Sequence, residues 1–107
     1  LSNVFPRSFP VGMSVEIISL KALKSAYSYM SKQSEFEHVT KYFYDNKDKF
    51  DILNFSQLPI NHSKIHLAVD TKKDLDRFKW IMNELGINYL SAEYKEIIKL
   101  YNKYEKK

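Results

Sequence analysis

Apolar and polar residues follow two different periods along the chain, and the changes of period predict strands alternating with helices. Val15 to Ile18 form a short β-branched run that is typical of a buried strand. Residues 50–55 and 65–69 place apolar side chains at every second position, which predicts two more strands, the last ending at Asp70. Pro59 and Asn61 predict a turn between these two strands.

Four other segments repeat apolar residues every three or four positions, the period of an amphipathic helix. We expect helices over residues 20–30, 34–46, 72–85 and 92–104. Ser19 and Ser91 are expected N-caps for the first and last, and Ser34 with Glu37 forms an S-x-x-E capping box for the second. Gly86 suits the C-terminal cap of the third.

The same periodicity assigns an inner face to each predicted helix. These faces comprise Leu20, Leu23, Tyr27 and Met30; Phe36, Val39 and Phe43; Leu75, Phe78, Ile81, Met82 and Leu85; and Tyr94, Ile97, Ile98 and Tyr101. Residues 1–14 contain Pro6, Pro10 and Gly12 and are expected to be extended or looped. Strands that alternate with helices indicate an α/β fold with a mixed sheet and about four helices.

Composition limits the protein to one domain or part of one. The chain has 107 residues, a mass of 12.7 kDa and no Cys, which excludes disulfides, thiol nucleophiles, Fe–S clusters and Cys-based zinc sites. The absence of Cys fits a reducing compartment, so we expect a cytoplasmic protein. Apolar runs are far shorter than the roughly 20 residues that span a bilayer, and residues 1–4 do not resemble an export signal. The chain opens without Met, which indicates a processed or excised piece.

The net charge of +4 raises the question of nucleic-acid binding. Of the 17 basic residues only Arg7 and Arg77 are Arg, and the Lys residues are scattered. Specific recognition of bases and phosphates favours clustered Arg, whose planar group makes paired hydrogen bonds. We therefore expect no nucleic-acid partner, although a basic nucleic-acid binder stays open as a third alternative.

Asp70 is the most informative single residue. It closes a predicted strand and precedes a predicted helix, so it is expected at the carboxyl edge of the sheet, where ligands bind in open α/β folds. A carboxylate there can hold Mg²⁺, which takes few protein ligands besides substrate phosphates. The alternative is that Asp70 or Thr71 caps the helix, with Asp74 in its first turn, and the residues alone favour this cap.

Three segments carry a resemblance to a known family. Residues 68–75, Ala-Val-Asp-Thr-Lys-Lys-Asp-Leu, resemble the V-D-T-P-E-D-L motif of sugar cytidylyltransferases, which include the CMP-KDO synthetases and related spore-coat polysaccharide proteins. Residues 2–16 are similar to that family's S-N-T-x-P-x-x-F-P-D-G-L-D-V-E, and residues 34–40 to its S-E-R-E-H-V-T. The resemblance covers nearly the whole chain but only the C-terminal half of such an enzyme.

This resemblance implies a fold, an activity and a cofactor. The fold is the C-terminal part of a Rossmann-like nucleotide-diphospho-sugar transferase, with residues 1–107 forming a single partial domain. The full enzyme would join CTP and a sugar, often a 3-deoxy acidic one, into a CMP-sugar for cell-surface polysaccharide, with Mg²⁺ as cofactor. We expect a homo-oligomer, at least a dimer, and no catalysis by this fragment alone. The second alternative is a non-catalytic dimerisation or interaction module derived from that fold.

The resemblance also assigns site residues. Asp70 is the expected metal ligand, and Arg7, Glu16, Glu37 and His38 are the expected sugar-binding residues; no catalytic residue is assigned. Three of these sugar-binding residues have a plain alternative: a structural ion pair for Glu16, a half-buried hydrogen-bonded ring for His38 and a solvated loop charge for Arg7.

Two departures affect the resemblance. Val11 and Ser14 replace motif carboxylates, which leaves open a different substrate or a loss of activity. Lys72 replaces the motif Pro. The remaining histidines, His62 and His66, lack the context of a zinc site.

Overall fold

The computed structural model describes residues 1–56 and 60–107, and these gather into two compact units. Unit 1 comprises Leu1–Phe9 and Ser14–Asn61, and unit 2 comprises Pro10–Met13 and His62–Lys107. The predicted single partial domain stays a prediction.

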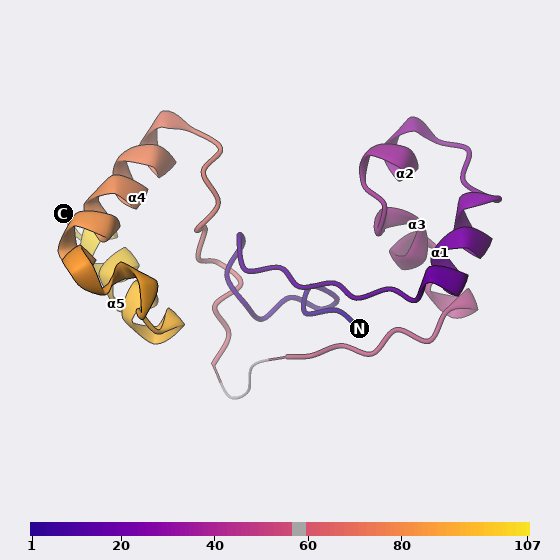
Figure 1. The fold of residues 1–107 in the computed structure, drawn as a ribbon, viewed down its shortest axis with the longest axis horizontal. Coiled ribbons are helices and arrows are strands. Elements are labelled where there is room, and N and C mark those ends of the chain that lie inside the picture. Colours follow the sequence, from indigo (N-terminus) through magenta and orange to yellow (C-terminus); the bar gives the residue numbers. More distant parts are fainter. Residues whose placement is uncertain (57–59) are drawn as a thin grey trace. The chain divides into compact units, whose positions relative to one another are not determined.

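The described residues form five α-helices and two short 3₁₀ helices (Figure 1). Their bounds are α1 Leu20–Tyr27, α2 Gln33–Glu37, α3 Lys41–Asp45, η1 Lys47–Lys49, α4 Lys72–Leu85, η2 Gly86–Leu90 and α5 Tyr94–Glu105. None of these helices is both long enough and apolar enough to cross a membrane.

The predicted α/β fold with a mixed sheet is wrong for the residues that the structure describes. The three predicted strand segments are extended, but they pair only at isolated bridges: Ser2 with Glu16 and Asn54, and Val11 with His66. Alternating side chains predict an extended backbone, whereas a strand also needs consecutive paired residues on a neighbour in register. Within the described residues, each of these pairs of segments is joined by one isolated bridge, so no ladder of consecutive paired residues forms. The predicted turn at Pro59 lies outside the described residues.

Among the helices, α4 has the predicted bounds, and its ends explain why. Thr71 is the N-cap and its hydroxyl accepts from the Asp74 backbone N–H, while Gly86 follows the last turn with a positive φ of 55°. Ser19 likewise caps α1, accepting from the Ala22 N–H at 3.1 Å. The prediction that Ser91 caps the last helix is wrong, because Glu93 is the N-cap of α5.

The second predicted helix divides into α2 and α3, because His38 has non-helical backbone angles. The predicted Ser34–Glu37 capping box is wrong. Instead Glu35, which is only 4% exposed, accepts from the backbone N–H groups of Ser31 and Lys32 at 2.9 and 3.0 Å. The helix therefore begins earlier than the sequence pattern indicates.

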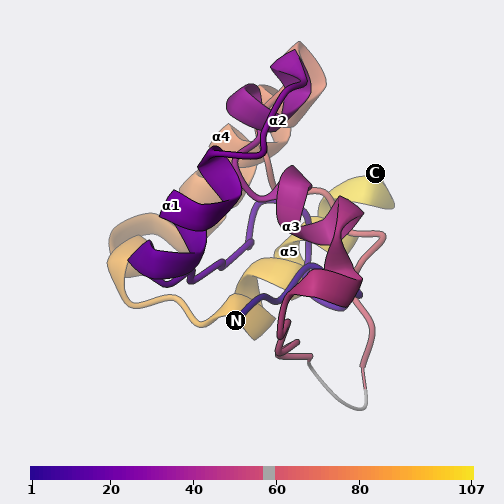
Figure 2. The same ribbon diagram turned by 90° about the vertical axis from the view of Figure 1, so that its right-hand side faces the viewer.

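The core of unit 1 lies among α1, α3 and the segment before α1 (Figure 2). Ala26, Tyr42 and Phe43 are buried, and the partly buried residues around them are Ile18, Ala22, Leu23, Met30 and Phe50. The inner face of α1 is only partly as predicted, since Leu20 and Tyr27 are exposed. Phe36 and Val39, predicted to face inward, are also exposed.

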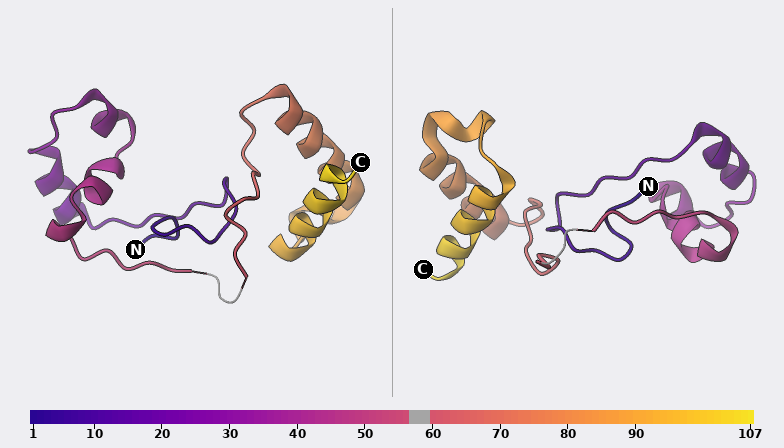
Figure 3. Two further views of the ribbon diagram at one scale, coloured as in Figure 1. Left: turned by 180° about the vertical axis from the view of Figure 1, so that it is seen from behind. Right: turned by 90° about the horizontal axis from the view of Figure 1, so that it is seen from below.

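In unit 2, α4 and α5 lie side by side (Figures 1 and 3). Ile81, Leu85 and Ile98 are buried as predicted, whereas Phe78 is 47% exposed. Arg77 is also buried, and its guanidinium donates to Asp74 at 2.6 Å, to Glu105 of α5 at 3.2 Å and to the His66 carbonyl at 2.7 Å. This one side chain ties both helices to the extended segment that precedes them.

Candidate functional site

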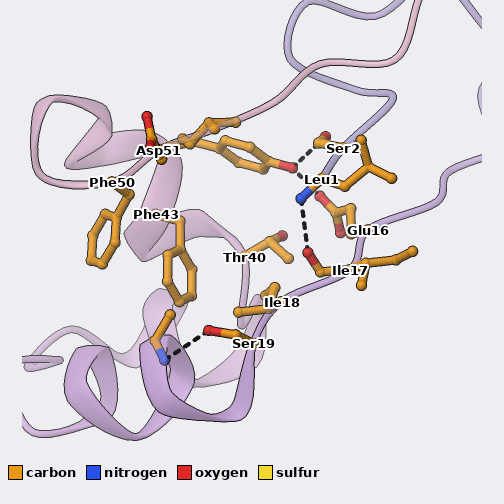
Figure 4. A pocket seen from close by; sticks show the side chains of 13 residues that line it. Leu1, Ser2, Glu16, Ile17, Ile18, Ser19, Thr40, Phe43, Phe50 and Asp51 are labelled. Carbon is orange, nitrogen blue, oxygen red and sulfur yellow. Dashed lines mark hydrogen bonds between the residues drawn. The ribbon is translucent and has the colours of Figure 1, made fainter.

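Unit 1 contains a pocket of about 360 Å³ (Figure 4). It is lined by three separate stretches of the chain: Leu1 and Ser2; Glu16 to Ser19 with Ala22; and Thr40, Phe43, Tyr44, Phe50, Asp51 and Ile52. The first two stretches belong to the motif segment of residues 2–16 or adjoin it, and Thr40 ends the motif segment of residues 34–40. Segments singled out separately by the sequence therefore meet at one cavity.

A chain of hydrogen bonds runs along one wall of this pocket. The Val4 N–H donates to Ser2 Oγ at 3.0 Å, Ser2 Oγ lies 2.7 Å from Tyr44 Oη, and Tyr44 donates to Glu16 Oε1. A phenol has one O–H proton, and Tyr44 uses it in the hydrogen bond to Glu16, so the Ser2 hydroxyl must be the donor in its hydrogen bond with Tyr44. Every group thus has a defined direction, and the chain ends on the Glu16 carboxylate.

Packing fixes the two hydroxyl groups of that chain. Ser2 is 3% exposed, and its backbone makes two hydrogen bonds to the neighbouring extended segment. The Ser2 N–H donates to the Leu53 carbonyl at 2.9 Å, and the Ser2 carbonyl accepts from the Phe55 N–H at 2.6 Å. The Tyr44 ring stacks on Phe5 with 4.8 Å between centroids. Burial, and then the bond to Glu16, raise the pKa of Tyr44, so its phenol stays a protonated donor at neutral pH.

The rest of the pocket is largely apolar. Phe43 and Phe50 pack together with 4.7 Å between centroids, and Ile18 and Ile52 complete this wall. A cavity with one apolar wall and a few fixed polar groups is typical of a small-molecule site. A ligand with a C–H face and a hydroxyl edge matches this arrangement.

Of the four residues expected to bind sugar, Glu16 is the one that lines the pocket. Arg7 lies outside the lining and donates to Ser14 Oγ at 3.1 Å, although its charge reaches Tyr44 and tends to lower that group's pKa. Glu37 and His38 are exposed at the end of α2 and are not among the lining residues. Their assignment to sugar binding stays a prediction.

Sequence reasoning missed Ser2 and Tyr44 as members of the site. Ser2 stands in the motif segment of residues 2–16 but has no role assigned from it, and Tyr44 lies in the predicted helix over residues 34–46 but outside its predicted inner face. The available signal was chemical, because a Tyr hydroxyl that is partly buried needs a hydrogen-bond partner. Its partners are 28 and 42 residues away in sequence, so no local pattern names them.

In unit 2, the structure places the expected metal ligand Asp70 beside two other candidate ligands. Asp70 Oδ2 lies 2.9 Å from His66 Nε2, and one ligand atom from each of His66, Asp70 and Asp74 falls within 4.8 Å of the others. The carboxylate of Asp70 is 66% exposed. The predicted alternative of a cap is confirmed for Thr71 with Asp74, which leaves the side chain of Asp70 outside the cap.

Only part of this trio suits a hard cation. Asp74 accepts from the Thr71 hydroxyl at 2.7 Å and from Arg77 at 2.6 Å, and these bonds, the Thr71 bond first, hold the pKa of Asp74 well below its usual range. Its oxygens are therefore already occupied by structural bonds. Imidazole nitrogen is not a ligand that Mg²⁺ prefers. Asp70 is the one member whose exposed oxygen fits Mg²⁺.

Comparison with known proteins gives a consistent but partial likeness. No family model matches the chain. A solved structure of a cytidylyltransferase from Leptospira borgpetersenii serovar Hardjo-bovis matches 98% of this chain and 43% of its own, with a TM-score of 0.86 and 27% identity. The uncharacterized protein MJ1063 of Methanocaldococcus jannaschii is 24% identical over 102 residues, which are 94% of this chain and 41% of that protein.

The chain is thus similar in fold and sequence to a cytidylyltransferase, and it spans less than half the length of either protein that it matches. This confirms the coarse part of the resemblance seen in the motifs. The narrower likeness to CMP-KDO synthetases and spore-coat proteins stays a prediction.

Proposed function

We propose that this chain is part of a nucleotidyltransferase that transfers a cytidylyl group from CTP to a sugar hydroxyl, releasing pyrophosphate. The observation that carries the proposal is the likeness to a cytidylyltransferase along 98% of the chain at a TM-score of 0.86. The pocket of unit 1 and the exposed carboxylate of Asp70 in unit 2 supply two of the parts such a reaction needs.

In this proposal the pocket of unit 1 receives the sugar. Glu16, oriented by Tyr44, accepts a hydrogen bond from a sugar hydroxyl, while Phe43 and Phe50 contact the apolar face of the ring. Holding the acceptor sugar in one orientation lowers the entropic part of the barrier to attack on the α-phosphorus. Arg7, Glu37 and His38 are retained as candidate contacts to other parts of the sugar.

Asp70 is the residue that would hold Mg²⁺. When bound, the ion neutralises the phosphates of the nucleotide and aligns them for in-line displacement. This chain's own contribution is the cap of Thr71 and Asp74, which fixes the start of α4 and hence the backbone that carries Asp70. A role in cell-surface polysaccharide synthesis belongs to the same proposal and rests on the motifs alone.

The second candidate, a non-catalytic module, has one observation in its favour. Val11 and Ser14 stand where the resembling family has carboxylates, and Gly12 between them packs against the backbone of Ala68 rather than lining an open loop. Loss of turnover with retention of the fold would fit that candidate.

The test is pyrophosphate release by the full-length protein with CTP, Mg²⁺ and a panel of sugars. Asp70→Asn should lower turnover at limiting Mg²⁺ by more than about tenfold, because a ligand to a hard cation is lost. Asp76→Asn is the matched control, since Asp76 on the same helix pairs with Lys72 at the surface. Turnover of Asp70→Asn equal to that of the control would contradict the metal role, and absence of release with every sugar would favour the non-catalytic module.

A further inference from the structure

The charged side chains that line the pocket of unit 1 are both acidic, and the terminal ammonium of Leu1, which also lies at the pocket, donates to the Ile17 carbonyl at 2.9 Å (Figure 4). Glu16 and Asp51 line the pocket, and no Lys, Arg or His side chain is among the described residues that do. Arg7, the basic residue whose charge reaches Tyr44, lies outside the lining with its guanidinium on Ser14. The side chains of the cavity therefore offer an incoming ligand two carboxylates, hydroxyl groups and an aromatic wall.

The direction of the hydrogen bonds narrows the ligand further. Glu16 already accepts a hydrogen bond from Tyr44, and an ionised carboxylate has only acceptor oxygens. A ligand group that contacts the remaining lone pairs of Glu16 must therefore be a hydrogen-bond donor. Sugar hydroxyls and ammonium groups donate, whereas a carboxylate on the ligand cannot. A ligand carboxylate that approached Glu16 would also meet a group of the same charge, which weakens its binding.

We propose that this pocket selects a sugar that carries no carboxylate, either a neutral sugar or an amino sugar, with Glu16 accepting from its hydroxyl or ammonium group. The inference rests on the proposed function for the identity of the ligand as a sugar. It departs from the acidic sugar that the motif resemblance implies. Ser2, Tyr44 and Glu16 act together as the polar edge, and Phe43 with Phe50 forms the surface for the C–H face of the ring.

The experiment compares three ligands of one configuration, a hexose, its 2-amino derivative and its uronic acid, with the full-length protein. Binding of each is measured by calorimetry without CTP, and turnover by pyrophosphate release with CTP and Mg²⁺. We expect the uronic acid to bind at least about tenfold more weakly than the hexose, as like-charge contact predicts. The amino sugar should bind as well as the hexose or better.

Variants attribute this discrimination to the pocket. Glu16→Gln keeps the shape and removes the charge, so the gap between hexose and uronic acid should shrink several-fold. Asp48→Asn is the matched control, because Asp48 is an exposed acidic residue of η1 outside the pocket lining, and it should keep the full gap.

The outcomes separate this inference from the proposed function. Equal or tighter binding of the uronic acid, or no binding of any of the three sugars, overturns the inference. Efficient turnover of the uronic acid leaves the nucleotidyl transfer standing and overturns the selectivity. Selective binding of the neutral and amino sugars without any pyrophosphate release supports the pocket and contradicts the transfer reaction.

Discussion

The Tyr44 hydroxyl is hydrogen-bonded to both Ser2 and Glu16, which lie far from it in the sequence, and it orients the carboxylate of the proposed sugar site. Tyr44→Phe keeps the ring stacked on Phe5 but removes the donor to Glu16 and leaves the Ser2 hydroxyl without its acceptor. We expect the sugar KM to rise by about three- to tenfold, corresponding to the roughly 1 kcal/mol of an ordinary hydrogen bond, while the CTP KM is unchanged.

The control for this change is Tyr29→Phe, because Tyr29 is 72% exposed and does not line the pocket. Steady-state kinetics with each substrate varied in turn measures the split between the two KM values. A general folding defect raises both KM values together, and that result would contradict a positioning role for Tyr44.

Gly12 shows a different dependence at the scale of one residue, on backbone space. Its φ is +98°, and a Cβ there would lie 2.7 Å from the Ala68 backbone nitrogen. Gly86 also has a positive φ, of 55°, but a Cβ there would meet nothing within 4 Å. Gly86→Ala should therefore cost only the backbone strain of its conformation, about 1–3 kcal/mol in free energy of unfolding, and Gly12→Ala should cost clearly more because a clash with the Ala68 backbone is added to that strain.

Urea unfolding of the two glycine variants, followed by circular dichroism, measures this difference. Equal midpoints for both variants would show that the segments around Gly12 and Ala68 separate easily, contrary to the close packing described for unit 2.

At the scale of elements, the start of α2 depends on one buried carboxylate. The backbone N–H groups of Lys32 and Ser31 lower the pKa of Glu35 from its ordinary value of 4.5. A lowered pKa in the folded state means that the stabilisation is present above the unfolded value and is lost as pH falls through the folded one. We expect α2 to lose protection from amide hydrogen exchange as pH is lowered below 4.5.

Glu35→Gln isolates this contribution, because the other carboxylates of the chain titrate in both proteins. The difference in protection between wild type and Glu35→Gln should be largest at neutral pH and vanish in acid. Glu37→Gln, at the exposed end of the same helix, should behave like wild type. A difference that does not change with pH would assign the role of Glu35 to packing instead.

The elements also show which parts of the fold the sequence could predict. Both ends of α4 are marked by residues that act within one turn, Thr71 with Asp74 and then Gly86, so a local pattern was sufficient. The predicted strands failed because alternation says nothing about a partner segment. The start of α2 was missed because Glu35 accepts from the backbone of Lys32, a contact that requires no particular side chain at that position.

The site divides in the same way. Asp70 and Glu16 could be named in advance because they stand inside recognisable motifs. The pairing of Glu16 with Tyr44 could not, because it joins residues 28 positions apart through the packing of unit 1. The acidic character of the charged side chains in the pocket was equally hidden, since it depends on which side chains the fold gathers and which, like Arg7, it leaves outside.

At the scale of the whole molecule, the two most exposed of the large apolar side chains in the described residues lie in unit 2. Around η2, Ile87 is 92% exposed and Leu90 is 84% exposed, with Phe78 and Tyr89 close to half exposed. Large apolar side chains left this exposed are typical of an interaction surface. We propose that the 107-residue chain associates in solution, at least as a dimer, through this surface.

Multi-angle light scattering measures the association directly. The chain should have at least twice its monomer mass of 12.7 kDa, and the double variant Ile87→Ser with Leu90→Ser should shift it towards monomer. Because neither side chain is buried, the helical circular dichroism signal should be retained, which separates lost association from lost folding. Asn102→Ser, an exposed polar change on α5, should leave the mass unaltered. A wild-type chain that stays monomeric at high concentration would contradict this proposal, because apolar side chains that are buried on dimerisation should drive association.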